Sequence, residues 1–155
     1  MKRIIVAIIV GLLCIQGMFA QTEKQISAID KQWQKIKSNI SSFTKEVKVE
    51  NNTGYRFVYS KDKELQMITV SYKDQDVDKK VFWYFVNGKM IYSEQTWTNT
   101  STGKIVDNEK FYFDNERLFA WIKDNKSIDT ASNDFKKADN EFVSYVVKLK
   151  EDSPK

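Results

Sequence analysis

The residues best suited to metal chemistry are three aspartates in one short polar segment, Asp74, Asp76 and Asp78. Carboxylates that alternate in a loop can converge on Ca²⁺, which takes about six to eight oxygen ligands. An EF-hand loop would continue with glycine at its sixth position and glutamate at its twelfth. This chain has Lys79 and Phe85 there. We therefore interpret the segment as an acidic hairpin turn, with weak Ca²⁺ binding as the alternative, and expect no resident metal or cofactor.

The residue types that the chain lacks exclude several classes of catalytic and metal site. It has no histidine and one cysteine, Cys14. A Ser-His-Asp triad and a histidine-ligated zinc site are therefore excluded, and thiol chemistry would depend on Cys14 alone. A pair of carboxylates, as glycosidases use, is the remaining enzymatic alternative. Because nearly all acidic residues lie among lysines in polar segments, we expect that the protein is not an enzyme.

Aromatic side chains are in excess, with 10 Phe, 7 Tyr and 4 Trp. In the run Val81–Val86, strand alternation puts Val81, Trp83 and Phe85 on one face and the other three residues on the second face. The second face is either covered or exposes an aromatic patch, and such patches often mark binding surfaces. The candidate ligand platform comprises Tyr59, Tyr72, Phe82, Tyr84, Tyr92 and Tyr112. The alternative is that both faces of a curved sheet are partly buried and these tyrosines belong to the core.

The elements that must position these side chains are strands. From Phe43 to about Lys123 the hydrophobic period is two, and polar turns separate segments of strand length. Asn87-Gly88 is the strongest hairpin signal, because these residue types tolerate the positive φ of a tight two-residue turn. Consecutive strands joined by short turns must be antiparallel. The pattern therefore predicts an antiparallel meander of six or seven strands.

An amphipathic helix is predicted on each side of the strands. Apolar residues recur at spacings of three and four in both segments, as one face of a helix requires. The N-terminal stripe is Ile26, Ile29, Trp33, Ile36 and Ile40, and the C-terminal stripe is Phe135, Ala138, Phe142, Tyr145 and Leu149. Thr22–Gln25 has the pattern of a capping box, and Ser132 or Asn133 is the candidate cap of the second helix. We predict an α+β fold in which both helices pack on one face of the sheet.

Two segments 28 residues apart, Trp83–Met90 and Phe111–Leu118, share the pattern aromatic-Tyr-Phe-x-Asn-x-basic-apolar. They predict two hairpins built on one plan. The second copy, F-Y-F-D-N-E-R-L followed by Trp121, resembles the Y-F-D-N-G-K-L hairpin of small exported proteins of gut-type, Bacteroides-type bacteria, most of them uncharacterised. Glu116 stands where that hairpin has glycine. The resemblance implies an exported helix-plus-meander domain and no particular activity or site.

The N-terminus has the layout of a secretory signal peptide. Lys2 and Arg3 precede the apolar run Ile4–Ile15, and the chain becomes polar after the small residue Ala20. We predict cleavage near Ala20 and a periplasmic or extracellular location. The alternatives are an uncleaved membrane anchor, for which the run is short, and lipidation of Cys14, which follows a bulky leucine rather than a small residue.

The predicted organisation is a signal peptide over 1–20, one α+β domain over 21–150 and a disordered tail over 151–155. Loss of the leader lowers the formal net charge from +4 by two, and the mixed charges that remain argue against a nucleic-acid partner. We expect a monomer without a transmembrane segment in its mature form, whose partner is a protein, a glycan or an apolar ligand. The predicted function is that of an exported, non-catalytic binding or structural domain. The alternatives are a periplasmic carrier of a lipid-like or other apolar ligand between the curved sheet and the helices, and a carboxylate-based hydrolase.

Overall fold

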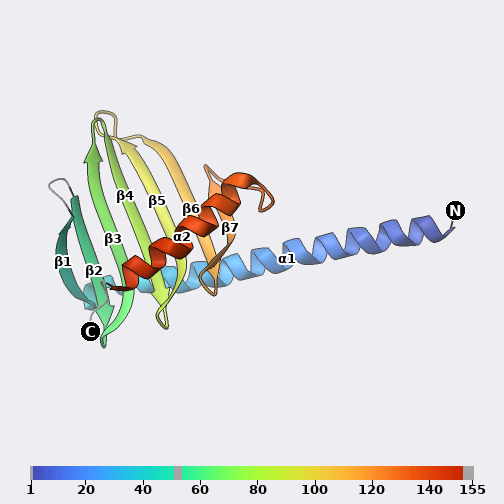
Figure 1. Ribbon diagram of the computed structural model, residues 1–155, viewed down its shortest axis with the longest axis horizontal. Helices are drawn as coiled ribbons and strands as arrows, with labels where there is room; N and C mark the ends of the chain where they lie inside the picture. The colour runs from blue at the N-terminus through green and yellow to red at the C-terminus, as the bar shows by residue number, and fades with distance from the viewer. Residues whose placement is uncertain (1, 51–53, 152–155) are drawn as a thin grey trace.

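A computed structural model describes the backbone of residues 2–50 and 54–151 and the side chains of residues 20–48 and 54–151. It confirms the predicted α+β class, with a helix, an antiparallel meander and a second helix in that order (Figure 1). The elements are α1 (Lys2–Ser38), the 3₁₀ turn η1 (Ile40–Ser42), β1 (Thr44–Glu50), β2 (Gly54–Lys61), β3 (Glu64–Asp74), β4 (Val77–Val86), β5 (Lys89–Asn99), β6 (Ile105–Asp114), β7 (Arg117–Lys123), β8 (Lys126–Ser127) and α2 (Asn133–Glu151).

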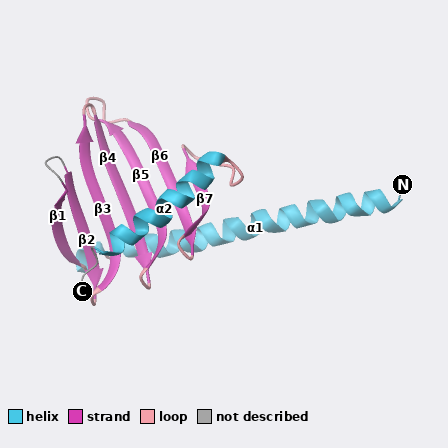
Figure 2. Ribbon diagram, in the orientation of Figure 1, coloured by secondary structure: helices cyan, strands magenta, loops and turns pink. Residues whose placement is uncertain are grey.

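The strands form one antiparallel sheet in the order of the chain, β1 to β8 (Figure 2). The described part of the chain thus contains eight strands, where the sequence predicts six or seven. The additional strand, β8, has two residues, which is too short for an alternating pattern to be visible. The predicted turn at Asn87-Gly88 is confirmed, because both residues have positive φ, 51° and 71°, as the tight hairpin turn requires.

The two helices lie on opposite faces of the sheet (Figures 1 and 2). One core cluster joins Trp83 and Phe85 to Phe142 of α2, and a second cluster joins Tyr84 and Tyr92 to Ile36 of α1. The prediction that both helices pack on one face is therefore wrong. The physical reason is that the β4 run is apolar on both of its faces, and each face is removed from water only when an element covers it.

Helix α1 carries the predicted apolar stripe except Ile40, which lies in η1, and the whole stripe packs into the second cluster. The helix is continuous from Lys2, so Thr22 lies inside it and the predicted capping box at Thr22–Gln25 is wrong. The backbone of the first part of α1 extends well beyond the sheet (Figure 1). Within the described residues, no helix combines the length and the apolar character that a membrane crossing needs.

Helix α2 begins at Asn133. Ser132, one of the two predicted caps, precedes it, and its Oγ accepts a hydrogen bond from the backbone N–H of Phe135 at 3.2 Å. Its predicted stripe is confirmed as part of the first core cluster. Asp139 joins the helix to the β6–β7 hairpin, because its carboxylate accepts hydrogen bonds from Arg117 and from the backbone N–H of Leu118. Glu151 is the last residue of the helix, and the other residues of the predicted tail, 152–155, lie outside the described residues.

The predicted pair of similar hairpins has a third member. The register shifts directly after Tyr59, Tyr84 and Tyr112. Each of these tyrosines stands three residues before the first of two turn residues with positive φ. Six residues after each tyrosine, an apolar side chain enters the core on the α2 face, and these side chains are Leu65, Met90 and Leu118. The hairpins β2–β3, β4–β5 and β6–β7 are therefore built on one plan.

Candidate functional site

The predicted aromatic platform is divided between the two faces of the sheet. Tyr59, Phe82, Tyr84, Tyr92 and Tyr112 belong to the face that α1 covers, whereas Tyr72 lies on the α2 face beside Val70 and Trp83. Trp33 of α1 stacks on Tyr92 with ring centroids 5.0 Å apart. Tyr84 and Tyr92 are 0% exposed. The centre of the predicted platform is therefore the surface against which α1 packs.

The buried tyrosines of the α1 face are poor candidates for acid–base chemistry. Burial raises the pKa of Tyr84, Tyr92 and Tyr112 above the ordinary value of 10.0, with nearby carboxylates adding to the shift. All three are therefore neutral near pH 7. Tyr112 donates a hydrogen bond to Asp30 Oδ1 at 3.1 Å, which ties α1 to the sheet.

The three aspartates proposed as weak metal ligands are not brought together. Asp74 Oδ2 lies 2.8 Å from Lys79 Nζ, and this hydrogen bond raises the pKa of the Lys79 ammonium group. Asp78 belongs to β4, beyond the turn that contains Asp76. Among the described residues, no group of three or more acidic, histidine or cysteine side chains is placed to hold a metal ion.

The α2 face of the sheet has a different composition. Strand register aligns its side chains in rows that run across the sheet from β3 to β7. The row under α2 is Ile68, Trp83, Ser93, Phe111 and Trp121, and the next row is Val70, Val81, Gln95, Glu109 and Lys123. An aromatic row thus adjoins a row that becomes polar from β5 onward.

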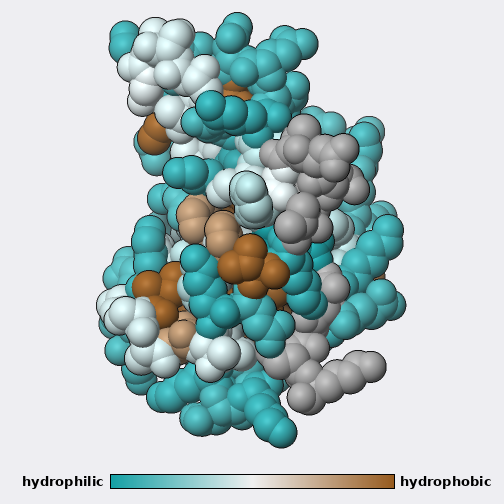
Figure 3. Space-filling view, turned by 90° about the vertical axis from the view of Figure 1, so that its left-hand side faces the viewer, coloured by the Kyte–Doolittle hydropathy of each residue, from teal (hydrophilic) through white to brown (hydrophobic). Residues whose placement is uncertain are grey.

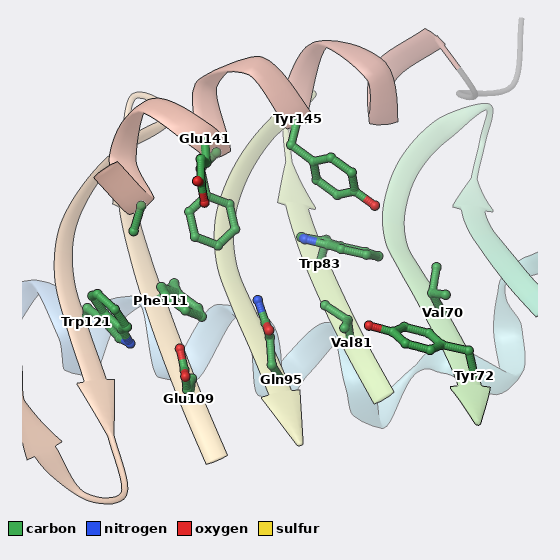
Figure 4. A pocket seen from close by; sticks show the side chains of 12 residues that line it. Val70, Tyr72, Val81, Trp83, Gln95, Glu109, Phe111, Trp121, Glu141 and Tyr145 are labelled. Carbon is green, nitrogen blue, oxygen red and sulfur yellow. The ribbon is translucent and has the colours of Figure 1, made fainter. Parts of the chain in front are cut away.

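A cavity of about 470 Å³ lies between these rows and α2 (Figure 4). Trp83, Phe111 and Trp121 line it from the sheet, and Glu141 and Tyr145 line it from the helix. Ala138 is the small member of the α2 stripe and also lines the cavity. A large side chain at that position would occupy part of this volume.

Several buried polar atoms on the α2 face of the sheet have no hydrogen-bond partner among the described residues. They include Nε1 of Trp83, Nε1 of Trp121, Oγ of Ser93 and Oδ1 of Asp107. Figure 4 shows the indole nitrogen of Trp83 turned toward the middle of the lining side chains and that of Trp121 turned toward Glu109. Native proteins pair the large majority of such groups. The two indole donors line the cavity itself and mark it as the candidate site. The hydroxyls of Tyr84 and Tyr92, which also have no partner among the described residues, lie on the α1 face instead.

The charged side chains that line the cavity, within the described part of the chain, are both carboxylates, Glu109 and Glu141. Lys123 Nζ lies 2.7 Å from Glu109 Oε1 and 3.1 Å from Asp107 Oδ2. These hydrogen bonds raise the pKa of Lys123, and Glu109 accepts the shorter of the two. Glu141 is mostly exposed and faces Lys137 at 3.9 Å along the helix.

A second hollow of about 650 Å³ lies between α1 and the end of the sheet, lined by Ile26, Phe119, Ile122 and Ile128 among others. It is larger, but none of the buried polar atoms without a partner lines it. The cavity beneath α2 is the better candidate because unpaired polar atoms line it, whereas a volume alone does not indicate what binds there.

Of the residues that line this cavity, sequence reasoning included only Tyr72 in its predicted platform. Alternation correctly placed Trp83 and Tyr84 on different faces of the sheet. It could not align Trp83 with Trp121, three strands away, because the bulges change the register. The one signal was Ala138, a small residue in a stripe of large ones.

No protein-family model, no curated protein and no solved structure matches this chain. The geometry alone therefore defines the class, an α+β meander domain with a cavity of mixed polarity beneath its second helix.

Proposed function

We propose that this protein is an exported, non-catalytic binding domain that holds a small ligand in the cavity between the sheet and α2. The observation that carries the proposal is the pair of buried indole N–H groups, of Trp83 and Trp121, that line the cavity and find no acceptor among the described residues. An unpaired buried donor costs about 1–3 kcal/mol. A ligand that supplies an acceptor recovers part of that cost, which favours binding.

The predicted alternative, a carrier of an apolar ligand, would use the same cavity but would bind a different kind of ligand. A carrier of a purely apolar ligand also needs a cavity between the sheet and a helix. An apolar ligand would leave both indole N–H groups and the side chain of Gln95 without partners, at a further desolvation cost. The walls therefore favour a ligand that has polar atoms of its own.

The hydrolase alternative receives less support from the cavity. Two carboxylates, Glu109 and Glu141, line it, and glycosidases need two. One of the pair must be protonated to act as the general acid. Glu109 forms an ion pair with the Lys123 ammonium group, and Glu141 is mostly exposed beside Lys137. Each carboxylate therefore has a cationic partner of its own.

Export is part of the proposal and rests on the N-terminal sequence. The described contacts of α1 with the core begin at Ile26. Cleavage near Ala20 would therefore leave every one of these contacts in place. N-terminal sequencing of the protein recovered from outside the cytoplasm should begin near Gln21. Recovery of the intact chain with the cytoplasmic fraction would contradict export.

Binding is tested by extraction. The protein, purified without denaturation from the cells that export it, is denatured and its small-molecule fraction is analysed by mass spectrometry. We expect a stoichiometric ligand from the native protein and from Ala131→Phe, because Ala131 is exposed. We expect none from Ala138→Phe, which fills the cavity. An identical yield from both variants, or no ligand from the native protein, would contradict the proposal.

A further inference from the structure

The walls of the cavity beneath α2 offer donors and acceptors together. The indole N–H groups of Trp83 and Trp121 only donate, and the carboxylates of Glu109 and Glu141 only accept. Gln95 does both. A hydroxyl group donates one hydrogen bond and accepts two. A ligand that carries several hydroxyls is therefore the simplest neutral molecule that satisfies both kinds of wall group.

Charge excludes two other classes of ligand. A fatty acid or a phosphate ester would bring its negative charge beside Glu109 and Glu141, and Lys123 is already bound to two carboxylates. Like charges in such a site repel. An organic cation would suit the carboxylates, but it brings no acceptor for the two indole N–H groups.

The aromatic surface indicates the shape of the ligand. Phe111 stacks on Trp121 with ring centroids 5.3 Å apart, and Trp83 lies 5.4 Å from Tyr145. Rigid flat walls of this kind suit a ring with an apolar face of C–H groups. The volume of about 470 Å³ lies in the range of roughly 300–1,000 Å³ that is usual for small-molecule sites.

We infer that the ligand is a neutral sugar of one or two rings, whose hydroxyls accept from Trp83 and Trp121 and donate to Glu109 and Gln95. This inference rests on the proposed function, because it names the ligand class of the same cavity. The carboxylates of Glu109 and Glu141 favour ligands with hydrogen-bond donors, and they disfavour acidic sugars because like charges repel.

The test is a calorimetric titration of the full chain with a panel of neutral monosaccharides and disaccharides at millimolar concentrations. Palmitate, choline and inorganic phosphate serve as comparison ligands. We expect binding of at least one neutral sugar and no binding of palmitate, choline or phosphate. Trp83→Phe and Trp121→Phe keep an aromatic ring but remove the N–H donor, so each should weaken sugar binding about tenfold.

Trp97→Phe is the matched control, because Trp97 does not line the cavity. It should bind the sugar as the native protein does. Binding of choline or palmitate without any sugar would overturn the sugar class but leave the proposed function standing. Sugar binding that Trp97→Phe weakens and the other two variants do not would place the sugar elsewhere and overturn the inference. If no sugar binds, the inference fails, and the extraction experiment decides the proposed function separately.

Discussion

At the scale of one residue, Ser93 allows the energetic cost of a buried, unpaired hydroxyl to be measured. It is 0% exposed, stands between Trp83 and Phe111 in the row beneath α2, and its Oγ has no partner among the described residues. Ser93→Ala removes the hydroxyl with little change in volume. We expect the free energy of unfolding of the ligand-free protein to rise by about 1 kcal/mol, as measured by urea denaturation.

Ser144 provides the control for this change, because its hydroxyl is exposed and bonded to a backbone carbonyl of its own helix. Ser144→Ala should leave the stability within about 0.5 kcal/mol of the native value. A clear loss of stability in Ser93→Ala would mean that the hydroxyl has a partner, and that the polar row is satisfied by the protein itself.

The buried tyrosines of the α1 face predict loss of stability at alkaline pH. The folded state keeps the protons of Tyr84, Tyr92 and Tyr112 beyond the ordinary pKa of 10.0. Above pH 10 the unfolded chain binds fewer protons than the folded chain, so stability is full below pH 10 and falls as pH rises. The slope approaches about 1.4 kcal/mol per pH unit for each tyrosine.

Tyr92→Phe separates this effect from other groups that titrate in the same range, among them Lys123. The ring and its contact with Trp33 are retained, and the ionisable hydroxyl is lost. Urea denaturation at a series of pH values above 10 should give a slope smaller by the contribution of one tyrosine. An unchanged slope would show that Tyr92 ionises as easily in the folded protein as in the unfolded chain.

The three hairpins of one plan give a prediction at the scale of the element. Gly88 and Lys63 are the second residues of equivalent turns, with φ of 71° and 66°. Left-handed backbone disfavours residues that have a Cβ. A Cβ at Gly88 would meet no atom within 4 Å, so Gly88→Ala tests the backbone alone. It should lower the free energy of unfolding by roughly 0.5–1 kcal/mol, and Lys63→Gly should raise it by a similar amount.

The attachment of α2 to the sheet depends on Asp139. Its carboxylate accepts from Leu118 N–H at 2.9 Å and forms an ion pair with Arg117. Asp139→Ala leaves that backbone N–H without its acceptor, and we expect a loss of about 2 kcal/mol. Amide hydrogen exchange should accelerate in α2 more than in α1. The exposed pair of Lys137 and Glu141 is the control, because Lys137→Ala should cost less than about 0.5 kcal/mol.

Much of this element-level description could be predicted from sequence. Periodicity identified both helical stripes, the face assignment within β4 and the Asn87-Gly88 turn, because each depends on residues near one another in the chain. The likeness of the β2–β3 hairpin to the other two was missed because Asp62-Lys63 lacks the Asn or Gly of the other turns. The placement of α1 and α2 on opposite faces was missed because an alternating pattern does not say which helix covers which face.

At the scale of the whole molecule, the sheet is the scaffold and its two faces differ. The α1 face is an aromatic packing surface, whereas the α2 face carries the mixed-polarity cavity. Along the β1 edge, small hydrophobic patches lie between hydrophilic side chains (Figure 3), and Lys45 places its ammonium group 4.0 Å from the ring centre of Phe57. Charged lysines on an edge strand discourage pairing with another chain, which agrees with the expected monomer.

The leader provides a prediction at this scale as well. Among the described side chains, the contacts of α1 with the core begin at Ile26. A chain of residues 21–155 should therefore unfold at the same urea concentration as the full chain. A lower midpoint for the shorter chain would mean that the segment before Gln21 stabilises the folded domain. It would then count against the predicted signal peptide.

The most direct test of the central claim, a ligand site beneath α2, follows the indole N–H signals by NMR. The chain has four tryptophans, and Trp→Phe variants assign their signals. The protein is titrated with the small-molecule fraction released from the denatured native protein. We expect the signals of Trp83 and Trp121 to move while those of Trp33 and Trp97 stay in place. If Trp83 and Trp121 do not respond, the cavity is not the binding site.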